Sequence, residues 1–386
     1  MLLLDIAFIV AGLVLLIAGG EALVRGASTL AARAGISPLV IGLVVVSAAT
    51  SAPELAVTLG AVLEGEPDLA LGNVVGSNIV NILFILGLSA VVTPLIIKRQ
   101  LVRFDIPIMV GLSVLLLVVS LDGRIGVIDG VLLLGGLLLH TVMSIVVGRR
   151  EVLAPGAASD QPALNARPVP LWLATVLLVA GIGLLVLGAR LLVDGAVSIA
   201  TSLGVSSLIV GLTVVAVGTS LPELATSIIA VRRGERDMAV GNIVGSNIFN
   251  IGMVLGLPAI LFGEGIPVPA AAIALDLPLM LATAIALLPI AFTGFVIARW
   301  EGGLFVALYI AYTVYLVLAS TQHSALEGFT DVMLVFVLPL IALTLVVFTA
   351  YEVGLRRGRR SVDDASTADT APTTAAGGPP SGPPAE

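Results

Sequence analysis

The chain has 386 residues, of which 58% are hydrophobic and only 11% are charged, and its formal net charge is -7. Soluble domains carry about 45–50% apolar and about 25% charged residues, so this composition excludes a soluble globular protein and indicates an integral membrane protein. The chain contains no cysteine, which excludes disulfides, thiolate metal sites and cysteine nucleophiles.

The first apolar stretch, residues 1–24, carries Asp5 where a secretory signal would carry basic residues, and it is long enough to cross the ~30 Å hydrocarbon core. We therefore interpret it as a membrane span. Further apolar stretches follow at 38–63, 69–95, 104–121, 126–147, 170–189, 206–231, 238–262, 271–297, 302–320 and 330–352. Their length and continuous apolar character favour helices over barrel strands, which predicts about eleven transmembrane helices.

The basic residues predict the orientation, because Lys and Arg concentrate on the cytoplasmic side of membrane proteins. With the N-terminus outside and the C-terminus in the cytoplasm, every one of the 18 Lys and Arg residues except Arg124 and Arg190 falls on the cytoplasmic side. The sequence therefore predicts a multi-pass protein of the cell (plasma) membrane in this orientation.

Two motifs occur twice. The sequence "GNVVGSNIVNI" at 72–82 returns as "GNIVGSNIFNI" at 241–251, and "TSAPEL" at 50–55 returns as "TSLPEL" at 219–224. Both pairs share one offset, and an odd number of spans separates the copies, so the second copy crosses the membrane in the opposite direction. We predict an all-α polytopic membrane protein with two inverted five-helix repeats, broken helices around midplane cation sites, and one appended C-terminal transmembrane helix.

This organisation divides the chain into five segments. They are a first inverted repeat (1–147), a cytoplasmic linker (148–169), a second inverted repeat (170–320), an extra transmembrane helix (330–352) and a disordered cytoplasmic tail (361–386) rich in Pro, Gly, Ser and Thr. At the same offset, Glu21 and Arg25 become Arg190 and Asp194. We expect each i,i+4 pair to balance charge near a helix end.

The repeated motifs combine broken helices with buried oxygen atoms. Pro53 and Pro222 lack an N–H, and each ring displaces the carbonyl four residues earlier, which frees backbone oxygens. Glu54 and Glu223 follow them directly. Hydroxyl and amide groups recur around each glutamate. An Asn, a Ser and an Asn stand at i, i+4 and i+8 on one face of the following helix. The residues are Thr50, Ser51, Asn73, Ser77 and Asn81 in the first half, and Thr219, Ser220, Asn242, Ser246 and Asn250 in the second.

Oxygen ligands without imidazole or thiolate suit hard cations such as Ca2+, Na+ or Mg2+. A carboxylate in the membrane costs about 2.5–3.5 kcal/mol on the insertion scale, so two equivalent glutamates indicate a functional charge. Polar groups can instead simply join transmembrane helices, but the duplicated Thr-Ser-x-Pro-Glu favours a cation site. His140 and His323 share no ligand spacing, and we expect structural or interfacial roles for both.

On these motifs the sequence resembles the cation/calcium antiporter superfamily, and within it the sodium/calcium exchangers of prokaryotic type. The two alpha repeats of that family are matched by residues 42–89 and 211–258, and the order of spans is similar over residues 1–320. The resemblance implies ten core helices, with the second and third helices of each half packed around adjacent cation sites. It implies no cofactor, since Ca2+ and Na+ are the transported ions.

The resemblance also implies the role of each site residue. Glu54 and Glu223 match the calcium ligands, assisted by the backbone carbonyls of Thr50 and Thr219. The positions that line the sodium sites in the family are Ser51, Ser77, Ser220 and Ser246, together with Glu54, Glu223, Thr50 and Thr219, and the central pair of amides is Asn81 and Asn250.

This chain departs from the family pattern in several places. Some members, and the potassium-dependent exchangers in particular, have Asp where Asn250 stands, which argues against potassium cotransport. Proton/calcium exchangers carry a Glu in a Gly-Asn-x-x-Glu signature that neither copy here contains, which favours sodium as the counter-ion. Position 47 is Ser but position 216 is Ala, so the two halves are not equivalent, and an eleventh span exceeds the ten-span scheme.

The resemblance implies a secondary antiporter that exchanges Ca2+ for Na+ by alternating access, exports calcium and is electrogenic, and that is not an enzyme. Proton/calcium (or other divalent cation) exchange is the alternative, because glutamates also bind protons; a cation channel and an intramembrane hydrolase are remoter ones. The expected partners are calcium and sodium ions and the lipid bilayer, with no nucleic acid and no obligatory protein partner.

Overall fold

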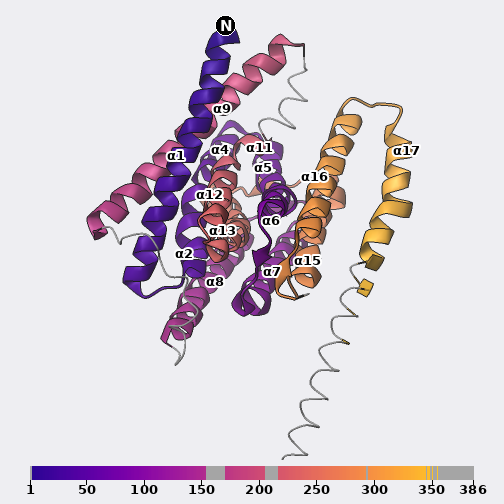
Figure 1. The fold of residues 1–386 in the computed structure, drawn as a ribbon. Coiled ribbons are helices and arrows are strands. Elements are labelled where there is room, and N and C mark those ends of the chain that lie inside the picture. Colours follow the sequence, from indigo (N-terminus) through magenta and orange to yellow (C-terminus); the bar gives the residue numbers. More distant parts are fainter. Residues whose placement is uncertain are drawn as a thin grey trace, which may run out of the picture.

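The computed structural model of the chain describes residues 2–153, 170–204, 216–292, 294–344, 346–347, 350 and 354. Most of the predicted linker, the first part of the span at 206–231 and the whole tail at 361–386 lie outside these residues. The described part is a helical bundle with two short pairs of strands (Figure 1).

The first half runs from α1 to α8, and η denotes a π-helical segment. Its elements are α1 (Leu2–Ala34), α2 (Pro38–Ile41), η1 (Gly42–Val46), α3 (Ser47–Thr50), α4 (Ala52–Glu64), α5 (Pro67–Ile79), η2 (Val80–Leu86), α6 (Gly87–Val92), β1 (Leu95–Ile96), η3 (Leu101–Asp105), α7 (Ile106–Val119), β2 (Arg124–Ile125) and α8 (Val127–Leu153). The helix α8 continues to Leu153 and so extends past the predicted boundary at residue 147.

The second half repeats this order. Its elements are α9 (Leu171–Ser202), α11 (Ala216–Gly218), α12 (Leu221–Arg232), α13 (Arg236–Phe249), η6 (Asn250–Leu255), α14 (Gly256–Leu261), β3 (Ile266–Pro267), η7 (Ala272–Asp276), α15 (Leu277–Phe292), β4 (Val296–Ile297) and α16 (Arg299–Ser320). Two further elements, α17 (Leu326–Asp331) and η8 (Val332–Val337), follow the repeat.

Among the described residues, nine helices are long and apolar enough to cross a membrane, and the bent pair Pro38–Thr50 and Ala52–Glu64 makes a tenth span. The predicted span at 206–231 is described only from Ala216 onward. The polytopic helical architecture predicted from hydropathy is therefore confirmed.

The predicted helix breaks occur at the repeated prolines. The second span bends by 42° between α3 and α4, where Ser51 has ψ 5° and Pro53 opens α4. In the second half, Ser220 has ψ 9° and Pro222 opens α12 in the same way. Since proline cannot continue the hydrogen bonds of the preceding helix, each break brings a new helix N-terminus into the interior of the bundle.

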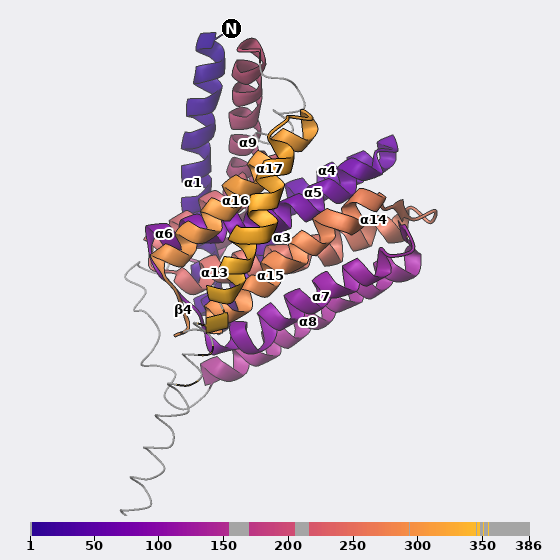
Figure 2. The same cartoon turned by 90° about the vertical axis from the view of Figure 1, so that its right-hand side faces the viewer.

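Close contacts between α1 and α9 reveal the two-fold relation of the halves. A Cβ atom on Gly12 would lie 2.7 Å from Gly188 O, and one on Gly19 would lie 2.9 Å from Gly181 O. The repeats are offset by 169 positions, as Asn78 and Asn247 are, so Gly181 is the equivalent of Gly12 and Gly188 that of Gly19. The same contact thus occurs twice with partners exchanged, as a two-fold relation requires. Figure 2 shows the two helices side by side, at a steep angle to α7 and α8.

The strand pairs obey the same relation. The strand β1 pairs antiparallel with β4, and β2 pairs antiparallel with β3. Because β1 and β3 are equivalent in the repeats, as are β2 and β4, each half contributes one strand to each pair. These pairs tie the ends of the inverted repeats together.

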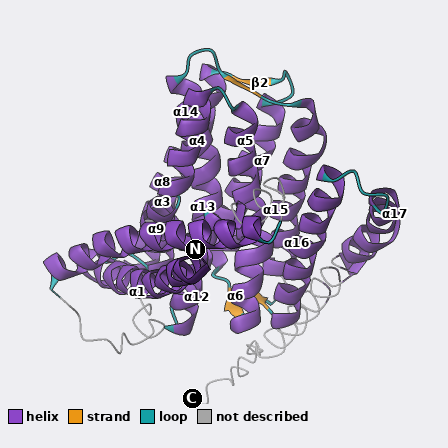
Figure 3. Cartoon of the chain, turned by 90° about the horizontal axis from the view of Figure 1, so that it is seen from above, coloured by secondary structure: helices purple, strands orange, loops and turns teal. Residues whose placement is uncertain are grey.

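Two helices form the centre of the bundle, and α17 with η8 lies at its edge. Every residue of α13 from Met238 to Ile248 is buried, and the span of α5, η2 and α6 is buried to a similar extent. In contrast, α17 and η8 bury no residue, and Figure 3 places α17 on the flank opposite α1 and α9. The functional groups must therefore be sought around α5 and α13.

Candidate cation-binding site

The two repeated glutamates lie together at the centre of the bundle. Glu54 is the third residue of α4 and Glu223 the third of α12, and neither has any exposed surface. Ser51 Oγ donates to Glu223 Oε1 and Ser220 Oγ donates to Glu54 Oε1, both at 3.3 Å. Each carboxylate therefore contacts the helix break of the other half. Both also occupy the first turn of a helix, where the helix dipole favours negative charge.

Among the residues that the structure describes, several buried oxygen atoms around this pair have no hydrogen-bond partner. They include the second carboxylate oxygen of Glu54 and of Glu223, the hydroxyls of Ser77 and Ser246, Asn81 Oδ1 and Asn250 Oδ1. Buried polar groups normally find a partner, and in the described part of the chain neither glutamate forms an ion pair with a basic side chain. These oxygens fit the ligand preference of a hard cation.

Two asparagines hold the helices of the site in register. Asn73 Nδ2 donates to Glu54 O at 3.0 Å and to Thr58 Oγ1 at 2.9 Å, which joins α5 to α4. In the second half, Asn242 Nδ2 donates to Ser227 Oγ at 3.2 Å, which joins α13 to α12. Asn73, Ser77 and Asn81 were predicted to share one face. Asn73 differs from the other two, because its side chain bonds the backbone of Glu54.

Asn242 also accepts a hydrogen bond from a residue of the first half. Thr50 Oγ1 donates to Asn242 Oδ1 at 3.3 Å, so this amide positions the hydroxyl of a predicted calcium ligand. Thr58 and Ser227 occupy equivalent positions four residues beyond the glutamates, and the sequence analysis did not single them out. Their signal was available, because a hydroxyl residue recurs there at the repeat offset.

Sequence analysis also missed Asn78 and Asn247. Asn250 Nδ2 donates to Asn78 Oδ1 at 3.1 Å, and Asn78 Nδ2 lies 3.5 Å from Asn247 O. Asn78 lies in α5 and Asn247 in α13, just before π-helical segments begin at Val80 and at Asn250. The asparagines next to Ser77 and Ser246 thereby link α5 to α13.

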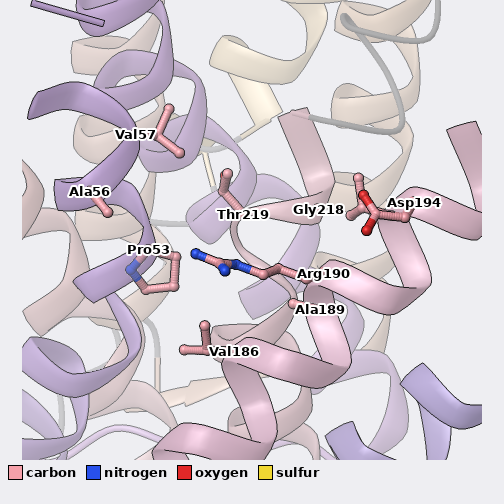
Figure 4. Close-up of a pocket in the computed structure, with 10 residues that line it drawn as sticks. Pro53, Ala56, Val57, Val186, Ala189, Arg190, Asp194, Gly218 and Thr219 are labelled. Atoms are coloured by element: carbon pink, nitrogen blue, oxygen red, sulfur yellow. The ribbon is translucent and has the colours of Figure 1, made fainter. Parts of the chain in front are cut away.

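The site is not symmetric at its two threonines. Thr50 is buried, whereas Thr219 is partly exposed and lines a cavity of about 310 Å³ with Pro53, Ala56, Ala189 and Arg190. Figure 4 shows the side chain of Arg190 extending into this cavity between Pro53 and Thr219. The other predicted residues, Ser51, Glu54, Ser77, Asn81, Ser220, Glu223, Ser246 and Asn250, are all buried. The cavity therefore reaches one edge of the site.

On the opposite side α1 covers the site. A Cβ atom on Gly20 would lie 2.5 Å from Ile229 Cδ1 and 3.4 Å from Ala225 O, so α1 packs directly on α12. The equivalents of Gly20 and Ala225 are Ala189 and Ala56, which both line the cavity. A helix contact that is closed in one half is thus open in the other.

The histidines do not contribute to this cluster. His140 Nε2 lies 2.9 Å from Asp105 Oδ1, and Ser144 Oγ donates to the same oxygen at 2.8 Å. His323 Nδ1 accepts from Ala325 N at 3.1 Å in the turn before α17. In the residues that the structure describes, no three His, Cys, Asp or Glu side chains form a metal-binding group, so the site has two carboxylates and neutral oxygens.

Inverted helical repeats around a buried pair of carboxylates define a polytopic membrane protein of the ion-transporting class. A sequence model of the sodium/calcium exchanger protein family matches residues 4–146 and 173–318, and the chain belongs to this family. It is therefore a membrane transporter of the exchanger type.

Relatives of known sequence and structure agree with this assignment. The putative antiporter CaxA of Alkalimonas amylolytica is 39% identical over 281 residues, which cover 73% of this chain and 88% of the relative. The sodium/calcium exchanger MaX1 of Methanosarcina acetivorans is 31% identical over 365 residues, covering 82% and 99%. A structure of the sodium-calcium exchanger NCX_Mj soaked with Na+ and Sr2+ matches with a TM-score of 0.68 and 32% identity, covering 80% of this chain and 97% of that one.

Proposed function

We propose that this protein exchanges Ca2+ for Na+ by alternating access, with Glu54 and Glu223 as the central ligands. The proposal rests above all on two buried carboxylates that face each other across the repeats, each with an oxygen that has no hydrogen-bond partner among the described residues. The names of the relatives MaX1 and NCX_Mj as sodium/calcium exchangers support the choice of ions.

The proposed ligand set follows the chemistry of each group. Calcium takes several oxygen ligands, including carboxylates and backbone carbonyls, which suits Glu54 and Glu223 with the carbonyls of Thr50 and Thr219. Sodium uses the same four residues together with Ser51, Ser77, Ser220 and Ser246, and Asn81 and Asn250 are the central amides. Ca2+ and Na+ are substrates in this scheme, and the exchanger uses no cofactor.

Charge provides the coupling between the two ions. One Ca2+ or two Na+ neutralise two ionised glutamates, so the ions exclude each other from the site. A third Na+ leaves the loaded site positive, and exchange of three Na+ for one Ca2+ moves net charge across the membrane. We therefore propose electrogenic exchange, in the direction of calcium export.

The cavity at Thr219 is the proposed route by which ions reach the site. In the orientation predicted from the basic residues, with the N-terminus outside and the C-terminus in the cytoplasm, this cavity opens to the outside. The packing of α1 on α12 closes the cytoplasmic side. An inverted repeat supplies two states of similar energy that open to opposite faces, so this arrangement corresponds to the outward-open one.

The test is uptake of calcium-45 into proteoliposomes under imposed gradients. We expect uptake into vesicles that are loaded with Na+ and diluted into Na+-free buffer, and none when K+ replaces Na+ inside. A shift of the uptake rate on clamping the membrane potential with valinomycin checks electrogenicity. Uptake driven by a proton gradient without Na+ would establish proton/calcium exchange instead, and uptake without any counter-gradient would indicate a channel.

A further inference from the structure

We propose that two ion pairs, Glu21–Arg233 and Glu64–Arg190, act as alternating locks on opposite sides of the cation site. One pair forms in each of the two states of the transporter, and the pairs position α1 and α9 against the central helices. This inference rests on the alternating access proposed above and adds the residues that hold each state closed.

The first lock is formed in the structure. Arg233 Nε donates to Glu21 Oε2 at 3.0 Å, and Arg233 Nη2 donates to Glu21 Oε1. The pair joins α1 to the end of α12, one residue from Gly20, where α1 packs most closely on Ile229 and Ala225. A two-point contact between guanidinium and carboxylate fixes geometry as well as distance. It therefore lies where α1 covers the cytoplasmic side of the site.

The repeat relation generates the second lock. The offset of 169 positions takes Glu21 to Arg190 and Arg233 to Glu64, so both members of the pair change sign and remain complementary. Glu64 is the last residue of α4, and Arg190 lies in α9. These are the helices that correspond to α12 and α1. The exchange preserves attraction, whereas a change at only one position would have produced repulsion.

The second lock is open in this structure. Over the described ranges, no ion pair or hydrogen bond joins Arg190 to Glu64. The Arg190 side chain instead extends into the cavity between Pro53 and Thr219 (Figure 4). Because Ala56 and Ala189 line that cavity while their equivalents Ala225 and Gly20 belong to the packed side, closing α9 on α4 would bring Arg190 toward Glu64.

The sequence predicted that Glu21 pairs with Arg25 and Arg190 with Asp194, each within one helix, and the structure shows neither pair among the described residues. The ion partner of Glu21 is Arg233, 212 positions away, rather than Arg25. Figure 4 shows Asp194 directed away from the guanidinium of Arg190, and the described residues include no ion pair between them. Glu21 therefore acts between helices and not within one.

The strength of such pairs suits a switch. An exposed ion pair changes a two-state population by up to about fivefold, equivalent to ~1 kcal/mol. Because one pair forms as the other opens, their contributions offset each other, and the two states keep similar energies. Neutralising a single lock should therefore shift the population measurably without unfolding the protein.

Site-specific labelling tests this directly, because the chain has no cysteine. Ala56→Cys reports the open side and Ala225→Cys the packed side, and an uncharged maleimide is applied to protein in nanodiscs, where both faces are accessible. We expect Ala56→Cys to react faster than Ala225→Cys. Adding Glu21→Gln should accelerate labelling at position 225 and slow it at position 56, by up to about fivefold.

Neutralising the other lock should have the opposite effect. Glu64→Gln and Arg190→Gln should each accelerate labelling at position 56 and slow it at position 225, and Glu64 serves as the cleaner variant because it does not line the cavity. The exchange Glu21→Arg with Arg233→Glu should restore the original rates. Asp237→Asn is the matched control: it breaks the 2.8 Å pair with Lys98 on the same side, contacts neither α1 nor α9 through that pair, and should leave both rates unchanged.

Shifts in the same direction for both locks, or no shift for either, would overturn the proposal. Labelling does not require transport, so the two proposals can fail separately. Normal sodium-driven calcium flux with unchanged labelling would reject the locks alone. Opposite labelling shifts in a protein without sodium/calcium exchange would support the locks and reject the proposed function.

Discussion

At the scale of single residues, the site consists of two acids that the fold places in equivalent positions. Each glutamate accepts a hydrogen bond from a serine hydroxyl of the other half at 3.3 Å. Its second carboxylate oxygen has no hydrogen-bond partner among the described residues. Two carboxylates this deeply buried must either bind positive charge or take up protons. A divalent ion bound between them, as proposed above, would satisfy this requirement.

Replacing either glutamate tests this requirement. Glu54→Gln or Glu223→Gln preserves size and one oxygen but removes the charge that attracts Ca2+. We expect calcium exchange to fall by more than the roughly 10–100-fold typical of losing a residue that only orients a metal ligand, with normal insertion into the membrane. Asp68→Asn, an exposed acid in the first turn of α5, is the control and should retain full flux. Near-normal exchange in a purified glutamate variant would remove that residue from the site.

A second prediction concerns the central amides. Asn250 Nδ2 donates to Asn78 Oδ1 at 3.1 Å. Asn250→Asp replaces this donor with an acceptor and adds a third acid to the proposed cation site. The added charge should make exchange sensitive to K+ or to pH, while expression stays near that of the unmodified protein. The measurement is calcium-45 flux over a series of pH values and K+ concentrations. Unchanged profiles would show that position 250 does not face the ions.

Particular residues show what the sequence could and could not predict. Glu54, Glu223 and the helix breaks were predictable, because proline chemistry is local and the motif occurs twice. The role of Asn78 was not, since its contact with Asn250 joins residues 172 positions apart, which the spacing within one helix does not reveal. The difference between Thr50 and Thr219 was equally out of reach, because it depends on how the neighbouring helices pack, which leaves a cavity beside Thr219 but buries Thr50.

At the scale of elements, the sequence did not predict how long the helices α1 and α9 are. The spans predicted from hydropathy end at residues 24 and 189, directly before Arg25 and Arg190. The helices are longer: α1 has 33 residues and α9 has 32. These helices continue because their glycines pack backbone against backbone, as small residues allow. Glu21, inside the predicted span 1–24, and Arg190, just beyond the span 170–189, therefore both lie within continuous helices, and Glu21 contacts another helix through Arg233.

This packing makes a prediction about α9. A Cβ atom on Gly181 would lie 2.6 Å from Leu23 N and 2.8 Å from Gly19 O, which are backbone atoms that cannot move independently. Gly181→Ala should therefore lower the stability, by about 1–3 kcal/mol as for other overpacked sites, and reduce the melting temperature in detergent.

The matched control lies two residues away on the same helix. A Cβ atom on Gly183 would meet no atom of the described residues within 4 Å, and alanine is the better helix former. Gly183→Ala should leave the melting temperature unchanged or raise it slightly. Equal melting temperatures for the two variants would show that α1 and α9 do not pack as closely as the structure indicates.

At the scale of the whole molecule, reciprocal contacts and one asymmetry together define a state. Glycine contacts, strand pairs and the hydroxyl–glutamate bonds all occur twice with partners exchanged. The packing of α1 on α12 occurs once, because its equivalent is the cavity beside Thr219. In the proposed alternating access, the contacts that occur twice belong to both states, and the contact that occurs once distinguishes them.

The last prediction concerns the residues that follow this frame. The family match ends at residue 318, and α17 and η8 bury no residue. The segment at 361–386 lies outside the described residues, and its composition offers few apolar side chains for packing. No residue of the proposed cation site lies in either segment, so we expect neither segment to supply a ligand. Truncation before residue 361 should therefore leave sodium-driven calcium flux per reconstituted molecule within about twofold of the full chain.

Truncation after Ser320 removes α17 and η8 as well, and it should reduce stability or assembly while flux per correctly inserted molecule is retained. An apolar helix at the edge of the bundle, with Val335 77% exposed and Phe336 66% exposed, contributes contacts with lipid more than with the core. The comparison needs two measurements on each truncation: the melting temperature in detergent and the flux per inserted molecule. Loss of flux in a truncated protein that remains stable and inserted would assign the C-terminal segment a regulatory role in exchange.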